Sequence, residues 1–392
     1  EIYTLSLHDA LPICGTIPSK LGQLNKLEVL LLSHNQLTGE IPLELGQMEI
    51  LRDLNLAVNQ LSGTIPLVLG QIQSLKSLDL AINLLSGVIP SILGQLRNVT
   101  SLRLHSNQLT GTIPSELGQL TTLQILDLSR NQLSDTIPPA LGQLGNLNTL
   151  ELYSNQLTGS FPSSLTEIAS LSNLDVSNNL LTGAIPEGFH RLEQLNLASN
   201  RFSGTIPANF PLESSTLIQI DLSDNQLTGT IPVGIFRMQQ LSILLLARNQ
   251  FNGELSGSPS VCSPTGVQLS VIDLSFNQLS GTMQFFKYFA QLTNLNIRHN
   301  LFTGAIEFNP EKYFGTPIPG CEYVGVVSIL DQLDVSENYF SELSRLPPSI
   351  KAFSAASCSL SGSVDSLSAL SLAELIDIRN NPKLSGEIPL LI

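Results

Sequence analysis

The sequence predicts an α/β repeat solenoid, a single elongated array of short strands and helical turns. Three observations predict it: a 24-residue pattern recurs along the chain, apolar residues hold fixed places in it, and glycine and proline punctuate each copy. The stretch 99–122, VTSLRLHSNQLTGTIPSELGQLTT, shows the pattern, with apolar residues at positions 1, 4, 6, 11, 15, 19 and 22. One copy is too small to bury its leucines alone, so neighbouring copies must stack on both sides.

Each copy begins with a short strand followed by an asparagine. Leu102 and Leu104 alternate with Arg103 and His105, a period of two that places the leucines on one face and the polar residues on the other. Asn107, at position 9, carries both a donor and acceptor for peptide groups that the following turn leaves inside the coil. Stacked copies would therefore form an asparagine ladder.

The second half of each copy predicts a turn and about one turn of helix. Gly111, at position 13, permits a positive φ. Asp135 occupies the same position in the next copy, so its φ is either ordinary or in the left-handed region, which aspartate tolerates better than most residues. In the segment that follows, Pro114 suits the first helical position and Gly118 the C-terminal exit of the helical turn.

The ladder position defines the extent of the array. It recurs every 24 residues from Asn35 to Asn179 and then at steps of 20 to 38 residues as far as Asn381, with Cys358 in place of one asparagine. We interpret Cys358 as a buried structural thiol. The array therefore covers residues 14–392, about 14 full repeats plus partial repeats at the ends. Residues 1–13 do not fit the pattern; they resemble a translated sequencing-adapter peptide or form a divergent N-terminal arm.

Composition and charge narrow the classes of partner. Lysine and arginine number 18 against 32 acidic residues, and the net charge of −14 disfavours nucleic acid and anionic membranes as partners. No apolar run approaches the ~18 residues that a membrane helix needs. Four cysteines without a CxxC pair predict no metal site, and nothing in the sequence predicts a cofactor.

The pattern LxxLxLxxNxLxGxIPxxLGxL resembles the plant-type leucine-rich repeat family of receptor-like kinases, receptor-like proteins and polygalacturonase inhibitors. The resemblance implies a right-handed leucine-rich repeat superhelix with a parallel sheet on the concave side, short helical turns on the convex side and a second, shorter strand near LTGxIP. It also implies binding of a protein or peptide on the concave face, outside the cell or at its surface. The paired-cysteine caps that flank such arrays do not occur in this sequence, which indicates a fragment.

The outward strand positions 3, 5, 7 and 8 are the expected binding surface. Position 5 is acidic in eight copies, which suits a basic peptide; alternatively, the string LDLS is a consensus whose aspartate is tolerated on a solvated face. Aromatic and arginine residues beside apolar neighbours are typical interface anchors, although scattered hydrophobic residues occur on any surface. The candidate partner-binding residues are Arg103, His105, Arg130, Glu151, Tyr153, Asp175, Asp221, Ile243, Leu245, Arg248, Asp273, Phe276 and Arg298.

Two segments outside the strands add candidates. The 38-residue ladder step after Asn300 contains Tyr313, Phe314 and Tyr323, which either meet a ligand or pack on the convex side. Cys262 and Cys321 lie within two repeats of each other, so a disulfide is an option in a secreted chain. Asn98 begins the only NxS/T sequon, which is a glycosylation candidate or a chance occurrence.

The sequence does not predict an enzyme, because its histidines are far apart in the array and no nucleophile stands beside a base. We expect a noncatalytic recognition solenoid from a receptor-like or secreted protein. The alternatives are a polygalacturonase-inhibitor-like protein and the ectodomain of a receptor kinase whose kinase is not in this sequence. A more remote alternative is an ice-binding protein, because position 12 is serine or threonine in most copies, although not in the one with Asn252.

Overall fold

A computed structural model describes residues 12–189, 191–207, 210, 216–255, 267–308 and 329–386. The chain divides into two compact units, residues 1–180 and 181–392. The hydrogen bonds of the first unit begin at Ile13, whose N–H donates to Asn35 Oδ1 at 2.8 Å and whose carbonyl accepts from the N–H of Gln36 at 2.9 Å. These two hydrogen bonds connect Ile13 to the coil of Asn35.

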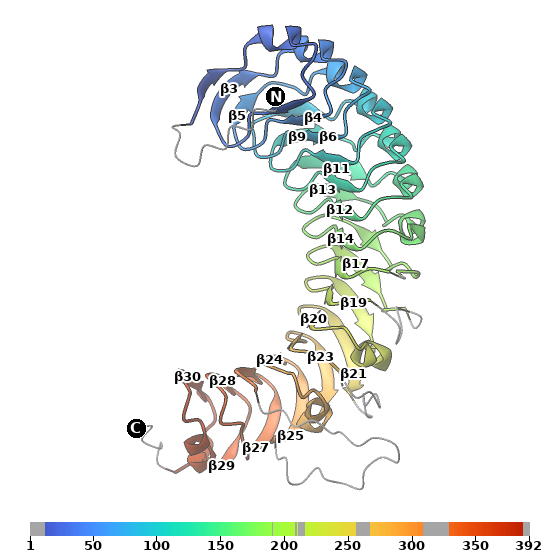
Figure 1. Ribbon diagram of the computed structural model, residues 1–392. Coiled ribbons are helices and arrows are strands. Elements are labelled where there is room, and N and C mark those ends of the chain that lie inside the picture. The colour runs from blue at the N-terminus through green and yellow to red at the C-terminus, as the bar shows by residue number, and fades with distance from the viewer. Residues whose placement is uncertain are drawn as a thin grey trace. The chain divides into compact units, whose positions relative to one another are not determined.

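The first unit is built on a parallel sheet with one strand from each coil (Figure 1). In register, Leu102 lies opposite Leu78 and Leu126, so the inward leucines of successive coils form one column. All three of these side chains are fully buried. The strands are β2 (Val29–Leu31), β4 (Asp53–Asn55), β6 (Ser77–Asp79), β8 (Ser101–Arg103), β10 (Ile125–Asp127), β12 (Thr149–Glu151) and β14 (Asn173–Asp175).

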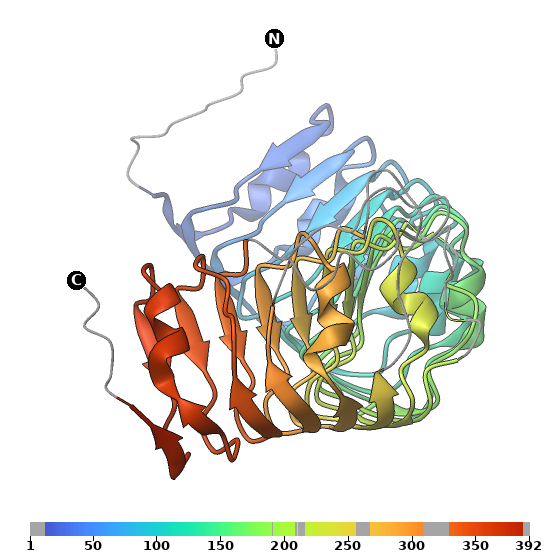
Figure 2. The same cartoon turned by 90° about the horizontal axis from the view of Figure 1, so that it is seen from below.

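The second unit repeats this arrangement, and its strands follow one another in chain order (Figure 2). The 38-residue step does not interrupt the sheet, because Asn294 on one side of the step pairs with Gln332 on the other. The strands are β16 (Gln194–Asn196), β18 (Gln219–Asp221), β20 (Ile243–Leu245), β22 (Val271–Asp273), β24 (Asn294–Asn296), β26 (Gln332–Asp334), β28 (Ala352–Ser354) and β30 (Leu375–Asp377).

A second series of parallel strands follows the asparagine of each coil, as the resemblance implied. In the first unit these are β1 (Cys14–Thr16), β3 (Gln36–Glu40), β5 (Gln60–Ser62), β7 (Ser86–Val88), β9 (Gln108–Gly111), β11 (Gln132–Thr136) and β13 (Gln156–Thr158). In the second they are β15 (Thr182–Gly183), β17 (Arg201–Gly204), β19 (Gln226–Gly229), β21 (Gln250–Leu255), β23 (Gln278–Gly281), β25 (Leu301–Ile306), β27 (Tyr339–Leu343), β29 (Ser361–Ser363) and β31 (Lys383–Ser385). The α/β repeat solenoid predicted from the sequence is thus confirmed.

The helical turns are 3₁₀ helices on the opposite side of each unit from the first strands (Figure 1). Those of the first unit are η1 (Ser19–Gln23), η2 (Leu43–Gln47), η3 (Leu67–Gln71), η4 (Ser91–Gln95), η5 (Ser115–Gln119), η6 (Pro139–Gln143) and η7 (Ser163–Glu167). Those described in the second are η8 (Val233–Arg237), η9 (Met283–Tyr288) and η11 (Val364–Ala369).

The predicted roles of Pro114 and Gly118 in this turn are wrong. Pro114 is the N-cap of η5, with an extended ψ of 130°, and its carbonyl accepts the N–H of Leu117 at 3.1 Å. Gly118 lies inside η5, not at its exit, and is buried. A Cβ on Gly118 would lie 2.3 Å from the carbonyl oxygen of Ala140 in the next coil, so close stacking of the coils requires this glycine.

The asparagine ladder forms as predicted. Asn131 Nδ2 donates to the carbonyls of Leu104, Leu128 and Ser129, each at 3.1 Å, and Asn131 Oδ1 accepts the N–H of Leu109 at 3.0 Å. One side chain thus connects two consecutive coils, its own and the preceding one. Because these peptide groups are buried, the amide satisfies donors and acceptors that no sheet partner reaches.

Cys358 is the exception in the ladder, and its side chain is fully buried, as predicted for a structural thiol. Its Sγ donates to the carbonyl of Val335 at 3.1 Å, in place of one of the bonds that asparagine makes. Burial raises the pKa of this thiol to about 11. The neutral, protonated form therefore dominates at physiological pH, which leaves the sulfur unreactive.

Position 8, the residue before the ladder asparagine, has a left-handed backbone that the sequence did not reveal. It has φ between 51° and 59° in every coil described, including the β-branched Val58 and Ile82, for which this conformation is rare. Asp135 also has a positive φ, 69°, which settles the choice left open at that position. The repeated hydrogen bonds of the coil hold these residues in a conformation that their side chains disfavour.

Candidate binding surface

The solvent-facing side chains at positions 3, 5, 7 and 8 of the first strands form what we call the concave face. Aspartate at position 5 has a structural task here, because its Oδ1 accepts the N–H two residues later and closes the turn after the strand. These bonds measure 2.8–3.2 Å and involve Asp79, Asp127, Asp175, Asp221, Asp273, Asp334 and Asp377. The aspartate of the LDLS string is thus explained by local structure.

In the first unit, Asp127 is the centre of a charged cluster. Its side chain is buried, and its Oδ1 accepts from both the N–H and the hydroxyl of Ser129, at 3.0 and 2.7 Å. His105 Nε2 lies 3.7 Å from Asp127 Oδ2. Glu151 is hydrogen bonded to Asp127 from the next strand. The structure therefore brings together two sequence candidates, His105 and Glu151, around an aspartate that the candidate set omitted.

Glu151 has a strongly perturbed carboxyl group. Burial raises its pKa from 4.5 to about 7, helped by the charges of Asp127 and Asp175 and by the hydrogen bond to Asp127, while Arg103 acts in the opposite direction. A protonated Glu151 can donate to the Asp127 carboxylate, whereas two ionised carboxylates repel each other. The cluster therefore holds a proton at pH values where an ordinary glutamate has lost it.

We expect the stability of the protein to fall as the pH rises from about 4.5 to about 7, because the unfolded chain releases the Glu151 proton earlier than the native chain. Half-burial and solvent screening limit the loss to about 1–2 kcal/mol. Glu151→Gln keeps an N–H donor toward Asp127 and should remove this part of the pH dependence. Urea denaturation at several pH values measures it, with exposed Glu44→Gln as the control; equal slopes for the wild type and Glu151→Gln would contradict the assignment.

Arg130 and Tyr153 form a second contact in the first unit. The guanidinium carbon of Arg130 lies 5.6 Å from the centre of the Tyr153 ring, which belongs to the next coil. This distance is within the range of a cation–π interaction. The ring and the charge are thus held near each other, as expected of anchors for a partner.

In the second unit, Phe276 is the centre of a stack of side chains. The guanidinium carbons of Arg248 and Arg298 lie 4.7 and 5.6 Å from the centre of its ring. The His299 ring stacks on it with centroids 5.1 Å apart. Arg248 Nε also lies 3.8 Å from Asp224 Oδ1. Three predicted candidates, Arg248, Phe276 and Arg298, therefore belong to one cluster drawn from consecutive coils.

Glu337 completes this stack, and the sequence reading did not select it. Arg298 Nε donates to Glu337 Oε1 at 3.1 Å, and His299 Nδ1 lies 2.7 Å from Glu337 Oε2. Hydrogen bonds from His299 and Arg298 hold the pKa of Glu337 below its usual range. Glu337 is at position 8, as are Arg248, Phe276 and His299, so a comparison of position 8 between coils would have found it.

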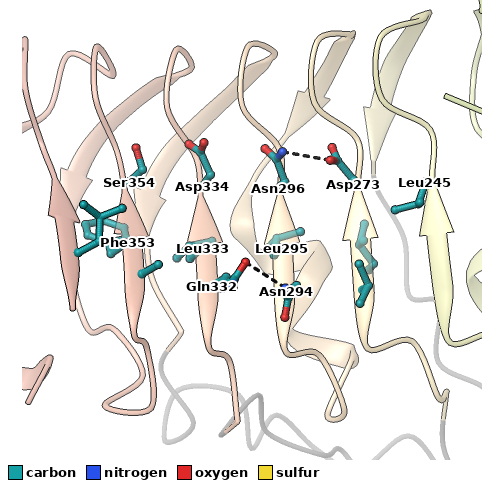
Figure 3. A pocket seen from close by; sticks show the side chains of 14 residues that line it. Leu245, Asp273, Asn294, Leu295, Asn296, Gln332, Leu333, Asp334, Phe353 and Ser354 are labelled. Carbon is teal, nitrogen blue, oxygen red and sulfur yellow. Dashed lines mark hydrogen bonds between the residues drawn. The ribbon is translucent and has the colours of Figure 1, made fainter. Parts of the chain in front are cut away.

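A hollow of about 360 Å³ lies on the concave face of the second unit, across strands β20 to β30 (Figure 3). It includes Leu245 and Asp273 from the candidate set. Two other candidates, Asp221 on β18 and Ile243 on β20, do not line the hollow. Asp221 Oδ1 accepts a hydrogen bond from the hydroxyl of Ser223 at 2.6 Å. The remaining residues of the hollow were not selected from the sequence.

Several predictions concern other parts of the chain. Tyr313, Phe314, Tyr323 and the proposed Cys262–Cys321 disulfide lie outside the described residues. Asn98 is exposed, and its Nδ2 donates to the carbonyl of Gln73 at 2.8 Å. Within the described ranges, none of the helices has the length and apolar character required to cross a bilayer.

Leucine rich repeat families match residues 73–133 and 121–181 and also 26–48, 191–212 and 216–238. The ectodomain of the Arabidopsis receptor kinase HAESA, solved with the peptide hormone IDA and the co-receptor SERK1, is 31% identical with a TM-score of 0.69; the match covers 96% of this chain and 70% of that one. The chain belongs to the plant-type leucine-rich repeat family.

Two further leucine-rich repeat structures are similar. The plant peptide hormone receptor RGFR1, in complex with RGF2, is 32% identical with a TM-score of 0.82 over 96% of this chain and 62% of that chain. The PEPR1–AtPEP1 structure is 29% identical with a TM-score of 0.69 over 96% and 58%. The chain thus spans less than two thirds of the length of these two structures. A comparison with curated protein sequences finds no match.

The serine and threonine hydroxyls at position 12, which we call the hydroxyl column, connect neighbouring coils. At position 12 hydroxyls donate to the glycine carbonyl of the preceding coil at 3.2–3.4 Å, as in Thr38, Ser86, Thr110 and Thr228. Their donor hydrogens are therefore engaged inside the second sheet, which gives the column a structural role.

Proposed function

We propose that this chain is a noncatalytic recognition module of a receptor-like or secreted protein, which binds a peptide or protein partner across its concave face outside the cell or at its surface. The observation that supports it most is the likeness of 96% of the chain to three structures: RGFR1 with RGF2, HAESA with the peptide hormone IDA, and PEPR1–AtPEP1. A sheet held in register by the asparagine ladder presents its outward side chains in fixed positions, which lowers the entropy lost on binding.

The side-chain clusters on the concave face agree with this function. The Arg248–Phe276–Arg298 stack is held in place by Asp224 and Glu337 before any partner arrives. Aromatic and arginine side chains that are fixed in this way are typical of interface anchors. The acidic net charge would accelerate encounters with basic partners more than it would strengthen the final complex.

The test is selection of 12-residue peptides from a displayed random library against the full chain, followed by binding measurements on the selected peptides. We expect Arg248→Ala/Phe276→Ala to weaken these peptides at least tenfold. The matched control is Leu67→Ser, which changes an exposed side chain on η3, away from the concave face. Failure to enrich any peptide, or enriched peptides that respond to Leu67→Ser and not to the double variant, would contradict the proposal.

A further inference from the structure

The hollow in the second unit is lined by two rows of side chains, one from position 5 and one from position 3 of consecutive strands (Figure 3). Polar groups occupy the middle of both rows; the position 3 row has apolar residues at both ends, and the position 5 row runs from a leucine to a serine. The position 5 row is Leu245, Asp273, Asn296, Asp334 and Ser354, and the position 3 row is Val271, Asn294, Gln332, Ala352 and Leu375.

Two carboxylates face this hollow from alternate strands. Asp273 on β22 and Asp334 on β26 are separated by β24, so their Cα atoms lie about 10 Å apart, two strand spacings. Asn296 stands between them; its Nδ2 donates to Asp273 Oδ2 at 3.1 Å, and its Oδ1 accepts the N–H of Arg298 at 3.1 Å. Both polar atoms of the Asn296 side chain are therefore hydrogen bonded, which fixes the orientation of this side chain between the two carboxylates.

The nearby arginines do not neutralise these carboxylates. Arg298 is bound to Glu337, and Arg379 pairs with Asp377 at 2.8 Å. None of the residues that line the hollow is basic, and within the described residues neither Asp273 nor Asp334 forms an ion pair. The hollow is thus a region of negative charge over an apolar and amide floor, which favours a partner that carries a cation.

The position 3 row offers hydrogen-bonding groups for the backbone of a peptide. Asn294 Nδ2 donates to Gln332 Oε1 at 3.1 Å, and both side chains belong to the rim of the hollow. The side-chain oxygen Asn294 Oδ1 and the side-chain nitrogen Gln332 Nε2 have no other partner among the described residues. Carboxamides with a spare acceptor and donor suit the N–H and C=O groups of an extended chain.

We propose that the hollow receives an extended peptide segment that places one lysine or arginine side chain above Asn296, between the carboxylates of Asp273 and Asp334. The proposal rests on the peptide-binding function above and names the chemistry of its ligand. An ammonium or guanidinium over Asn296 lies one strand spacing, about 5 Å, from each of the two strands that carry Asp273 and Asp334, so both carboxylates attract it electrostatically. Flanking apolar residues of the peptide pack on Leu245 and Leu375, at the two ends of the hollow.

The test uses three pools of acetylated, amidated nonapeptides, random except for a fixed central lysine, norleucine or glutamate. Norleucine keeps the apolar stem of lysine without its charge. Fluorescence polarisation measures their binding to the full chain, to Asp273→Asn/Asp334→Asn and to a control, Asp79→Asn/Asp175→Asn, which removes the same charge from the first unit. Asparagine keeps the Oδ1 acceptor that closes each turn, so both double variants should fold, and circular dichroism checks this.

We expect the lysine pool to bind the wild type about tenfold more tightly than the norleucine pool, and the glutamate pool to bind most weakly. Asp273→Asn/Asp334→Asn should abolish the lysine preference, and Asp79→Asn/Asp175→Asn should keep it. A preference that survives the first variant, or that both variants abolish equally, overturns the proposal. Equal binding of all pools overturns it while leaving peptide recognition intact, whereas binding of no pool and of no displayed peptide contradicts the proposed function itself.

Discussion

Asn131→Ala is expected to reduce the free energy of unfolding by about 3–5 kcal/mol, the largest effect of any single substitution considered for this protein. The amide donates to three carbonyls and accepts one N–H, all at 3.0–3.1 Å. Alanine would leave these peptide groups buried without partners, and each such group costs about 1–3 kcal/mol. Denaturation in guanidinium chloride, followed by far-UV circular dichroism, measures the change.

Two further variants separate the ladder from general effects at this site. Gln132→Ala removes a neighbouring amide that is exposed, and its cost should stay within about 0.5 kcal/mol. Asn131→Cys should be intermediate, because Cys358 at the same position donates one bond, to Val335, where asparagine makes several. If Asn131→Ala costs no more than Gln132→Ala, the ladder does not stabilise the coils in the way described.

The fold could be predicted from the sequence because each coil depends on its neighbours through residues that recur at one spacing. The alternation of apolar and polar residues around Leu102 predicted the strand, because a period of two is typical of a half-buried strand. The recurring asparagine, as at Asn107, predicted buried peptide groups, because its amide can satisfy both donors and acceptors. The Cys358 exception could also be interpreted, since a thiol is small, apolar and able to donate weakly.

Other features depend on contacts between coils that the sequence does not express. The left-handed φ of Val58 and Ile82 contradicts the preference of their side chains, so no rule based on residue type would select them. The task of Asp127 in its turn was hidden because the same aspartate also suits a charged surface. Local and functional explanations coincide at such positions, and only hydrogen-bond geometry separates them.

The candidate site was predicted in part. The sequence grouped Arg248 with Phe276, and the two side chains are in contact in the structure. This could be predicted because both residues are at position 8 of adjacent coils. Glu337 was missed because 38 residues separate it from His299 in the sequence, although the two side chains lie in contact. The hollow could not be predicted at all, because it depends on which side chains in six coils are short enough to leave space.

Gly118→Ala is the second large effect, with an expected cost of about 2–4 kcal/mol. The glycine lies within η5 and has no unusual backbone angle, so the cost does not come from its φ. It comes from the next coil: an added Cβ would meet the Ala140 carbonyl oxygen at 2.3 Å and its carbonyl carbon at 2.7 Å. Relief requires the backbones of two coils to separate, which disturbs the stacking on which both depend.

Gly145→Ala is the matched control, because it makes the same chemical change in the turn that follows η6, where nothing lies within 4 Å of the added Cβ. It should be neutral or stabilise the protein by up to about 1 kcal/mol, since alanine reduces the entropy of the unfolded chain. A thermal melt of both variants beside the wild type decides the matter. Equal melting temperatures for Gly118→Ala and Gly145→Ala would mean that the coils can separate at little cost, and the glycine would then have no role in their spacing.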